Sequence, residues 1–310
     1  MLAICFGLTL AGSATWQNTV VDRRTPTGPS GRIVYVRHGA IFLTSVDGRT
    51  TRQLTRIRGS IRDLAVSPDG RRIAFDMRVA GTVGKIAFYR SEIWTFDTTT
   101  SASGRVTRGG SDTEPAWSND GRRIMFSHLV FDRAGGWTVA IFSVRPDASR
   151  RRRMTSPRIP SDDGVCDMNP LAWPGRAAFL FERASSCTHG FPPTIEARTT
   201  AGREIPILDR LGEKFESVDS LDVAPTGRRV VFVASPVGSD DSAEGIYVSR
   251  PDGSAARRLT VDGYSPSWSP DGGWIAFARS GDIWIMRSDG SEPRRVTRSP
   301  QTEDAPDWLP

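Results

Sequence analysis

One segment recurs along this 310-residue chain, and it constrains the fold more than any other feature. Its copies are LAVSPDGRRIAF (64–75), PAWSNDGRRIMF (115–126), PLAWPGRAAFLF (170–181), LDVAPTGRRVVF (221–232) and PSWSPDGGWIAF (266–277), and the chain ends on a sixth, PDWLP (306–310), which stops at its turn. Aligned on Val66, Trp117, Trp173, Val223, Trp268 and Trp308, the copies lie 40 to 56 residues apart. This period is typical of four-stranded propeller blades.

Each copy predicts four short strands. In the clearest copy we expect them at 265–269, 274–279, 282–287 and 293–298. Asp-Gly pairs join the first strand to the second and the third to the fourth, as in hairpins, because glycine adopts positive φ without steric cost. The second and third strands are almost continuously apolar, which is typical of sheets buried on both faces.

The two ends of the chain complement each other. The last copy stops after its first strand, while residues 31–55 supply the other three strands of a copy. We therefore expect an all-β, six-bladed β-propeller of four-stranded antiparallel blades over 31–310, closed by the C-terminal strand joining the N-terminal blade. Closure leaves no open sheet edge.

The repeat also carries a family resemblance. The pattern P-x-W-S-P-D-G-x-x-I-A-F, followed by I-W-x-M-x-x-D-G and R-R-x-T, resembles the WD-like repeats of the TolB family propeller over about residues 31–310. The resemblance implies a protein-binding role. TolB carries an α/β domain ahead of its propeller, whereas residues 15–30 provide only a short linker here, so we expect the propeller without that domain.

The N-terminus indicates export. Residues 2–11 form an apolar run followed by Gly12-Ser13-Ala14, which predicts a signal peptide over 1–14. The run is too short to span a membrane as a helix. We expect a periplasmic or secreted bacterial protein, monomeric and without an integral membrane span.

The cysteines fit that compartment. Beyond the predicted leader only Cys166 and Cys187 remain, an even number for an exported protein. Cys166 precedes the first strand of its copy and Cys187 follows the second, so both should lie on the same face. We predict a disulfide between them.

Strand direction separates two faces of the ring. The short turns after strands one and three lie on one face and are uniform, as the backbone requires. The longer connections, 76–91, 127–137, 182–194 and 235–244 after strand two and 109–114, 156–168, 209–219 and 261–264 after strand four, lie on the other and are irregular. Binding usually resides in variable loops on a rigid scaffold, and Trp137 is the aromatic side chain there that we expect to make a contact.

Acidic residues recur just before the innermost strand, at Asp63, Asp112, Glu114, Asp167, Asp219, Asp262, Glu303 and Asp304. They should ring one mouth of the central channel, although the protein as a whole carries a formal charge of +6. Such a mouth would attract a basic peptide segment or a cation such as Ca²⁺. The alternative is that each acid caps the backbone at a strand entry.

Catalytic signatures are missing. The chain has no G-x-S-x-G, P-loop or H-E-x-x-H motif, and no cofactor is expected. Its three histidines, His38, His128 and His189, fall in connections of different blades, which favours surface positions over a metal site. His128 and His189 are the weak candidates if a metal is present.

The conspicuous charge run Arg150–Arg153 falls at an outermost strand and favours a solvated edge. Nucleic-acid binding would need a continuous basic stripe with interleaved aromatic residues, which the chain lacks. We therefore expect a non-catalytic exported propeller that binds a protein or peptide through its irregular face and acidic mouth. The alternatives are a metal-dependent lyase or hydrolase with its site over the channel, and a sensor propeller that acts with a separately encoded peptidase.

Overall fold

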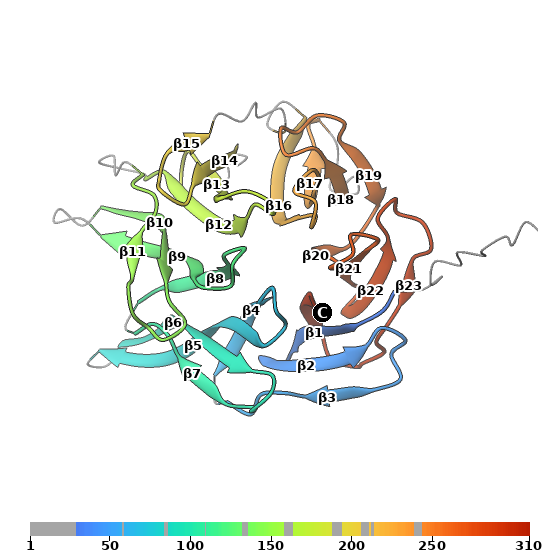
Figure 1. Ribbon diagram of the computed structural model, residues 1–310, viewed down its shortest axis with the longest axis horizontal. Coiled ribbons are helices and arrows are strands. Elements are labelled where there is room, and N and C mark those ends of the chain that lie inside the picture. The colour runs from blue at the N-terminus through green and yellow to red at the C-terminus, as the bar shows by residue number, and fades with distance from the viewer. Residues whose placement is uncertain are drawn as a thin grey trace, which may run out of the picture.

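A computed structural model describes residues 29–57, 59–83, 86–108, 110–131, 136–157, 164–187, 194–205, 211, 214–238 and 244–310. The predicted signal peptide over 1–14 and nearly all of the linker over 15–30 lie outside these residues, as does His189. The described residues form six four-stranded antiparallel sheets arranged in a ring (Figure 1). The predicted six-bladed propeller is confirmed.

The six blades are named in chain order, each from its inner to its outer strand. Blade 1 contains β24 (Glu303–Leu309), β1 (Arg32–Arg37), β2 (Ala40–Ser45) and β3 (Thr51–Gln53), and blade 2 contains β4 (Ser60–Val66), β5 (Arg72–Val83), β6 (Ile86–Asp97) and β7 (Ser103–Arg105). Blade 3 contains β8 (Asp112–Trp117), β9 (Ile124–Phe131), β10 (Trp137–Val144) and β11 (Arg152–Arg153). Blade 4 contains β12 (Cys166–Ala172), β13 (Ala178–Ala184), β14 (Thr194–Thr199) and β15 (Glu204–Ile205). Blade 5 contains β16 (Phe215–Val223), β17 (Val230–Pro236), β18 (Gly245–Ser249) and β19 (Arg257–Thr260), and blade 6 contains β20 (Tyr264–Trp268), β21 (Trp274–Arg279), β22 (Asp282–Arg287) and β23 (Arg294–Arg295).

The ring closes in blade 1 as expected. β24 pairs with β1 in antiparallel register, with Trp308 opposite Ile33 and Glu303 opposite Arg37. The inner strands β4, β8, β12, β16, β20 and β24 surround the central channel (Figure 1). The C-terminal strand β24 is therefore the inner strand of blade 1, whereas in the other five blades the inner strand is adjacent in sequence to the strands it joins.

The hydrophobic core lies between blades rather than within one layer. Six clusters of buried side chains each join two neighbouring blades. On β1, for example, Ile33 and Tyr35 pack toward blade 6, whereas Val34 and Val36 pack toward blade 2. This alternation explains why the second and third strands read as continuous apolar runs, because both faces of each sheet are covered.

The repeated Thr of R-R-x-T has a structural role. The Oγ1 atoms of Thr55, Thr107, Thr155 and Thr297 each accept the backbone N–H of a buried isoleucine of the third strand (Ile41, Ile93, Ile141 and Ile283), at 2.9–3.0 Å. These threonines are buried. They attach the end of the outer strand to the blade where regular strand pairing has already ended.

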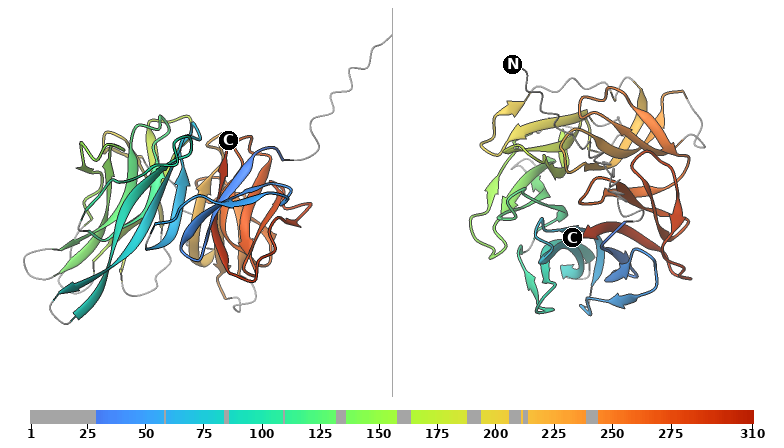
Figure 2. Two further views of the ribbon diagram at one scale, coloured as in Figure 1. Left: turned by 90° about the horizontal axis from the view of Figure 1, so that it is seen from below. Right: turned by 45° about the vertical axis from the view of Figure 1, so that its right-hand side comes forward.

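Two expectations need correction. Residues 76–91 belong mostly to strands, because β5 and β6 form a long hairpin that reaches Val83 and Ile86; this part of the ring extends well beyond its neighbours (Figure 2). In the fourth copy the residue equivalent to Trp117 is Ala172 and not Trp173, because Ala172 pairs with Phe179 as Trp117 pairs with Ile124. Trp173 instead sends its Nε1–H to the carbonyl oxygen of Gly227 in the next blade, at 2.9 Å.

Candidate functional site

Each inner strand contains a β-bulge at the same place, three residues before the position of Trp117. We call the residues there the bulge residues: Asp63, Glu114, Asn169, Ser220, Ser265 and Ala305. All except Asp63 have φ between 47° and 56°, a left-handed conformation that is uncommon for residues other than glycine. The bulge breaks the strict alternation of side chains and thus fixes which side chains reach the channel.

The inner strands enclose a channel cavity of about 800 Å³. Among the residues that the structure describes, its lining contains six carboxylates and one basic side chain, Arg62. The six, which we call the channel carboxylates, are Asp63, Glu114, Asp219, Asp222, Asp304 and Asp307. A protein with a net positive charge thus concentrates negative charge along its central axis, where low-dielectric walls focus the field.

Four of the eight predicted mouth residues line this cavity: Asp63, Glu114, Asp219 and Asp304. The other four have ion-pair partners instead. Asp112, Asp167 and Glu303 are fully buried at the beginning of their strands, opposite His128, Arg183 and Arg37 of the second strand. Asp262 lies 2.8 Å from Arg279 Nε. The expectation that all eight ring the mouth is therefore corrected for these four, because each contacts or lies opposite a side chain of the second strand and none lines the cavity.

The buried ion pairs are well formed. Asp167 binds Arg183 through both carboxylate oxygens, at 2.7 and 3.1 Å. Glu303 accepts hydrogen bonds from the Arg37 guanidinium and from Thr297 Oγ1. These acids join the inner strand to an arginine of the same blade, and these contacts are to side chains and not to the backbone at a strand entry.

The cavity also extends further than expected. Its wall includes the prolines of the short turns after the inner strands, among them Pro68, Pro225, Pro270 and Pro310. The acidic cavity therefore reaches the face of uniform turns, not only the face of irregular loops. Turn residues for which no binding role was expected form part of its rim.

The channel carboxylates hold neighbouring inner strands together. Asp307 accepts the N–H of Val66 at 2.7 Å and the hydroxyl of Ser267 at 2.9 Å, and Asp222 accepts the N–H of Trp268 at 2.6 Å. Glu114 accepts the N–H of Asn169 at 3.0 Å. Each of these bonds crosses from one blade to the next, so the same groups form the lining and join the inner strands.

Burial and mutual repulsion perturb these carboxyl groups. Burial, and then the nearby carboxylate of Asp307, raises the pKa of Asp222 to about 7. Burial raises the pKa of Asp307 as well. The pKa of Asp63 is raised well above its ordinary value by burial and by Asp76, Glu114 and Asp304. The negative charge of the channel therefore increases as the pH rises through neutrality.

Two further acids lie behind the lining. Asp76 on β5 accepts the N–H groups of Arg62 and Asp63, and burial raises its pKa to about 6. Glu182 on β13 accepts a hydrogen bond from Asn169 Nδ2 at 2.7 Å through Oε2, while its buried Oε1 has no hydrogen-bond partner within the part of the chain that the structure describes. Each interrupts an apolar strand, a signal by which they could have been found from sequence.

The two histidines that the structure describes, His38 and His128, lie in different blades. His128 lies on β9, where its Nδ1 is 2.5 Å from Asp112 Oδ1 and its ring packs edge-on against Phe142. It is therefore part of the blade and not a surface loop residue. His38 lies in the β1–β2 turn with φ 49°. Within the described residues, no group of three His, Cys, Asp or Glu side chains is arranged to hold a metal ion.

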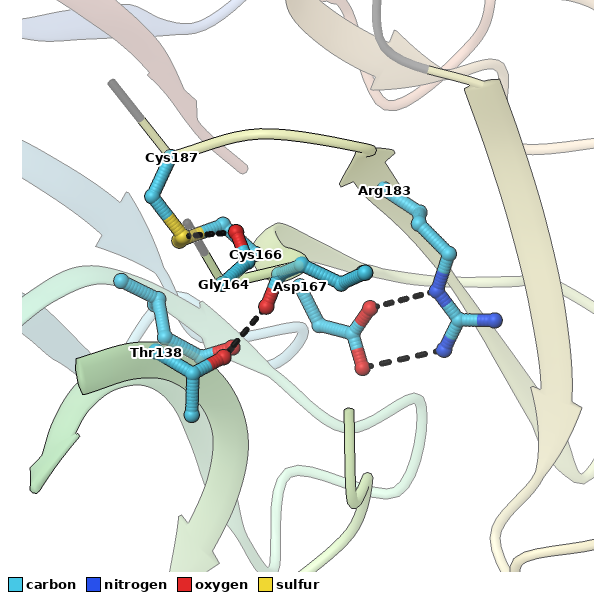
Figure 3. The surroundings of a disulfide bond; sticks show 8 residues. Thr138, Gly164, Cys166, Asp167, Arg183 and Cys187 are labelled. Atoms are coloured by element: carbon cyan, nitrogen blue, oxygen red, sulfur yellow. Dashed lines mark hydrogen bonds and ion pairs between the residues drawn. A yellow bond between two sulfur atoms is a disulfide. The ribbon is translucent and has the colours of Figure 1, made fainter. Parts of the chain in front are cut away.

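The predicted disulfide is confirmed. Cys166 and Cys187 are bonded across a Cα–Cα distance of 5.4 Å, and they join the beginning of β12 to the segment after β13 (Figure 3). Thr138 on β10 donates to the carbonyl oxygen of Val165, which attaches the disulfide-bonded segment to blade 3.

Trp137, the residue before Thr138, lies opposite Phe131, and Phe131 is 65% exposed. The expected contact residue thus stands beside an exposed aromatic side chain.

The described residues contain no helix long and apolar enough to cross a membrane. No protein-family model matches the chain. A curated relative is 35% identical over 107 residues, the uncharacterized peptidase YuxL of Bacillus subtilis (strain 168). The match covers 30% of this chain and only 16% of that protein.

Solved structures match over most of the chain. TolB from Acinetobacter baumannii superposes with a TM-score of 0.70 at 22% identity, covering 90% of this chain and 67% of TolB. An oligogalacturonate lyase from Vibrio parahaemolyticus has a TM-score of 0.54 at 9% identity, covering 87% of this chain and 80% of the lyase. The fold is therefore that of a TolB-like propeller, a fold that enzymes share.

Proposed function

We propose that this TolB-like propeller is a non-catalytic scaffold that binds a basic segment of a protein or peptide in its acidic channel. The observation that supports this most directly is the lining, in which six carboxylates face one arginine in a cavity of about 800 Å³. A cavity of that size is in the range of specific ligand sites. A cationic segment would relieve the repulsion between the carboxylates and gain charge-assisted hydrogen bonds.

A rigid ring favours binding of a ligand in the channel. Its channel wall is fixed by hydrogen bonds between blades, so little conformational entropy is lost on binding. The irregular face would add contacts through Trp137 and Phe131. A divalent cation such as Ca²⁺ is the second ligand that suits carboxylate oxygens, and it would compete with the peptide for the same charges.

Export is part of the proposal and is supported by the disulfide between Cys166 and Cys187, since disulfides persist in oxidising compartments. A periplasmic or secreted location agrees with the predicted leader over 1–14.

A lysine-rich peptide tests the proposal. Fluorescence anisotropy would measure binding of a labelled oligolysine peptide, with an oligoglutamine peptide of equal length as a control. Asp219→Asn/Asp304→Asn removes two channel charges, and Asp47→Asn/Asp289→Asn removes two charges from exposed turns. We expect the first variant to bind at least about tenfold more weakly, because charge-assisted hydrogen bonds contribute roughly 1.5–3 kcal/mol each. Equal binding by both variants would contradict a role for the channel.

A second candidate function is a propeller that acts with a peptidase, and the likeness to YuxL favours it. Co-purification with a separately encoded peptidase, and dependence of that enzyme's activity on this protein, would support this role. A metal-dependent lyase has only the structural likeness to the oligogalacturonate lyase in its favour. Stoichiometric metal that disappears in His128→Ala would establish it in place of the binding role.

A further inference from the structure

A second pocket, of about 760 Å³, lies at the seam between blades 2 and 3, away from the central channel. We call it the arginine pocket. Its walls are the beginning of β5, the third strand of blade 2, and the two short turns of blade 3, with the lining Arg72, Thr95, Asp120, Gly121, Arg122, Arg123, Arg145, Pro146 and Asp147. It therefore opens on the face of uniform turns.

The arginines of this pocket lack the ion pairs that fix several other arginines of the protein. Elsewhere, Arg37, Arg105, Arg151, Arg183, Arg198, Arg279, Arg287 and Arg295 each lie within 4.0 Å of a carboxylate of another strand or turn. Across the described ranges, none of Arg72, Arg122, Arg123 and Arg145 forms such an ion pair. Within the described residues no carboxylate lies within 4.0 Å of these four guanidinium groups, although Arg72 acts electrostatically on Asp97, Arg122 on Asp120 and Arg145 on Asp147.

Arg123 is anchored by neutral oxygen atoms. Its Nε donates to Ser143 Oγ at 3.0 Å, and one terminal nitrogen donates to the carbonyl oxygens of Ser143 and Arg150 at 3.1 and 2.5 Å. These acceptors are neutral and orient the guanidinium. Burial, and then the charges of Arg152 and Arg145, lower the pKa of Arg123, while Asp120 raises it.

The two aspartates of the lining accept hydrogen bonds within their own turns. Asp120 accepts the hydroxyl of Ser118 at 2.6 Å and the N–H of Arg122 at 3.1 Å, while Asp147 accepts the N–H of Ser149 at 2.9 Å. With Asp97, which lies opposite Arg72, three carboxylates stand against the four arginines and the nearby Arg152, so the pocket keeps a net positive charge. Arg152, from the charge run Arg150–Arg153, lies beside the pocket, with its Nε 3.4 Å from Ser143 Oγ. Arg152 and Arg153 are exposed on the outermost strand β11, as expected for a solvated edge.

We propose that the arginine pocket binds a ligand carrying two or more phosphate groups. The planar guanidinium fork matches the oxygen geometry of phosphate, and phosphate brings enough charge to balance several arginines. The pocket is several times larger than one phosphate group, so a single phosphate would leave arginines unpaired. Both a free phosphorylated compound and a phosphorylated lipid headgroup present this chemistry.

The test uses inorganic pyrophosphate and a charge-matched pair of triple variants. Arg72→Gln/Arg122→Gln/Arg145→Gln removes three exposed pocket arginines and keeps the anchored Arg123. Arg52→Gln/Arg228→Gln/Arg258→Gln removes three exposed arginines from blades 1 and 5 and changes the net charge equally. Calorimetric titration of the full protein with pyrophosphate would measure Kd, and cosedimentation would measure binding to phosphatidylcholine vesicles that contain phosphatidylinositol bisphosphate, whose headgroup carries more than one phosphate group.

We expect saturable binding that weakens at least tenfold in the pocket variant and changes less than threefold in the control variant. Binding to pyrophosphate alone would assign a free phosphorylated ligand, whereas vesicle binding that pyrophosphate displaces and the pocket variant loses would assign a headgroup. An equal loss in the two variants would reduce the effect to net charge and overturn the proposal. Failure of the unaltered protein to bind either probe would overturn it too.

Discussion

The channel carboxylate of Asp222 offers a sharp test of the electrostatic reasoning. It is buried beside Asp307, and its pKa is raised from 3.8 to about 7. Between these two values the folded protein binds the proton more tightly than the unfolded chain does, so stability falls as the pH rises through this window. Asp222→Asn removes the titration and retains an amide oxygen that can accept the N–H of Trp268.

The magnitude follows from the two pKa values. Compared with a group that has its ordinary pKa in both states, this carboxyl lowers the free energy of unfolding by about 4 kcal/mol at pH 8. At pH 5, where the folded state keeps the proton and the unfolded chain loses it, the free energy of unfolding is lower by between roughly 1 and 2 kcal/mol. The stability of Asp222→Asn relative to the unaltered protein should therefore increase by roughly 2 to 3 kcal/mol between pH 5 and pH 8. Asp222 also accepts the N–H of Val223, at 2.7 Å. If the amide of Asp222→Asn cannot accept this hydrogen bond as well, the unfolding free energy of the variant is lower by the same amount at both pH values.

Urea unfolding of both proteins, with the disulfide oxidised, would be followed by tryptophan fluorescence at pH 5, 6.5 and 8. Asp47→Asn is the matched control, because its carboxylate is exposed in a turn and its pKa is lowered by hydrogen bonds from Ser45 and Arg49. It should show no gain with rising pH. A stability difference for Asp222→Asn that is the same at pH 5 and pH 8 would refute the argument that this carboxylate is costly to ionise.

Three further outcomes are expected. Glu303→Ala leaves the Arg37 guanidinium partly buried without its partner and should cost roughly 3–5 kcal/mol of unfolding free energy, measured by urea denaturation, while exposed Glu292→Ala should change it little. Cys166→Ser/Cys187→Ser should cost about 2–4 kcal/mol, an effect that reductant reproduces in the unaltered protein only. Trp117→Phe loses the Nε1–H bond to the carbonyl oxygen of Ala65 in the preceding blade and should lower the unfolding free energy by about 1 kcal/mol or more; an unchanged value would show that this bond between blades is energetically neutral.

The blade architecture could be predicted because each blade repeats the same requirements. Asp-Gly turns, apolar second and third strands and a complementary pair of ends are all visible in the sequence. The disulfide followed from strand direction, which places Cys166 and Cys187 on one face. These inferences need only the order of strands and not the exact register.

The candidate site depended on register, which the sequence does not show directly. A shift of one residue on a strand moves a side chain to the other face, and the bulge in every inner strand introduces such a shift. Acids at the first position, such as Asp167, therefore pair with the second strand, whereas Asp219 and Asp304 reach the channel. Asp222 and Asp307 were missed, although each occupies a position that is alanine, leucine or serine in the other copies.

The pairing of β24 with β1 has a consequence for how the ring forms. The Arg37–Glu303 contact joins residues 266 positions apart, whereas strands within the other blades are close in the chain. Contacts of such long range form late, because the chain between them must first be ordered. The first blade thus keeps an unpaired inner edge until the last strand arrives. A circular permutant opened in the turn between β11 and β12 should move this late step to blades 3 and 4 without altering the finished ring.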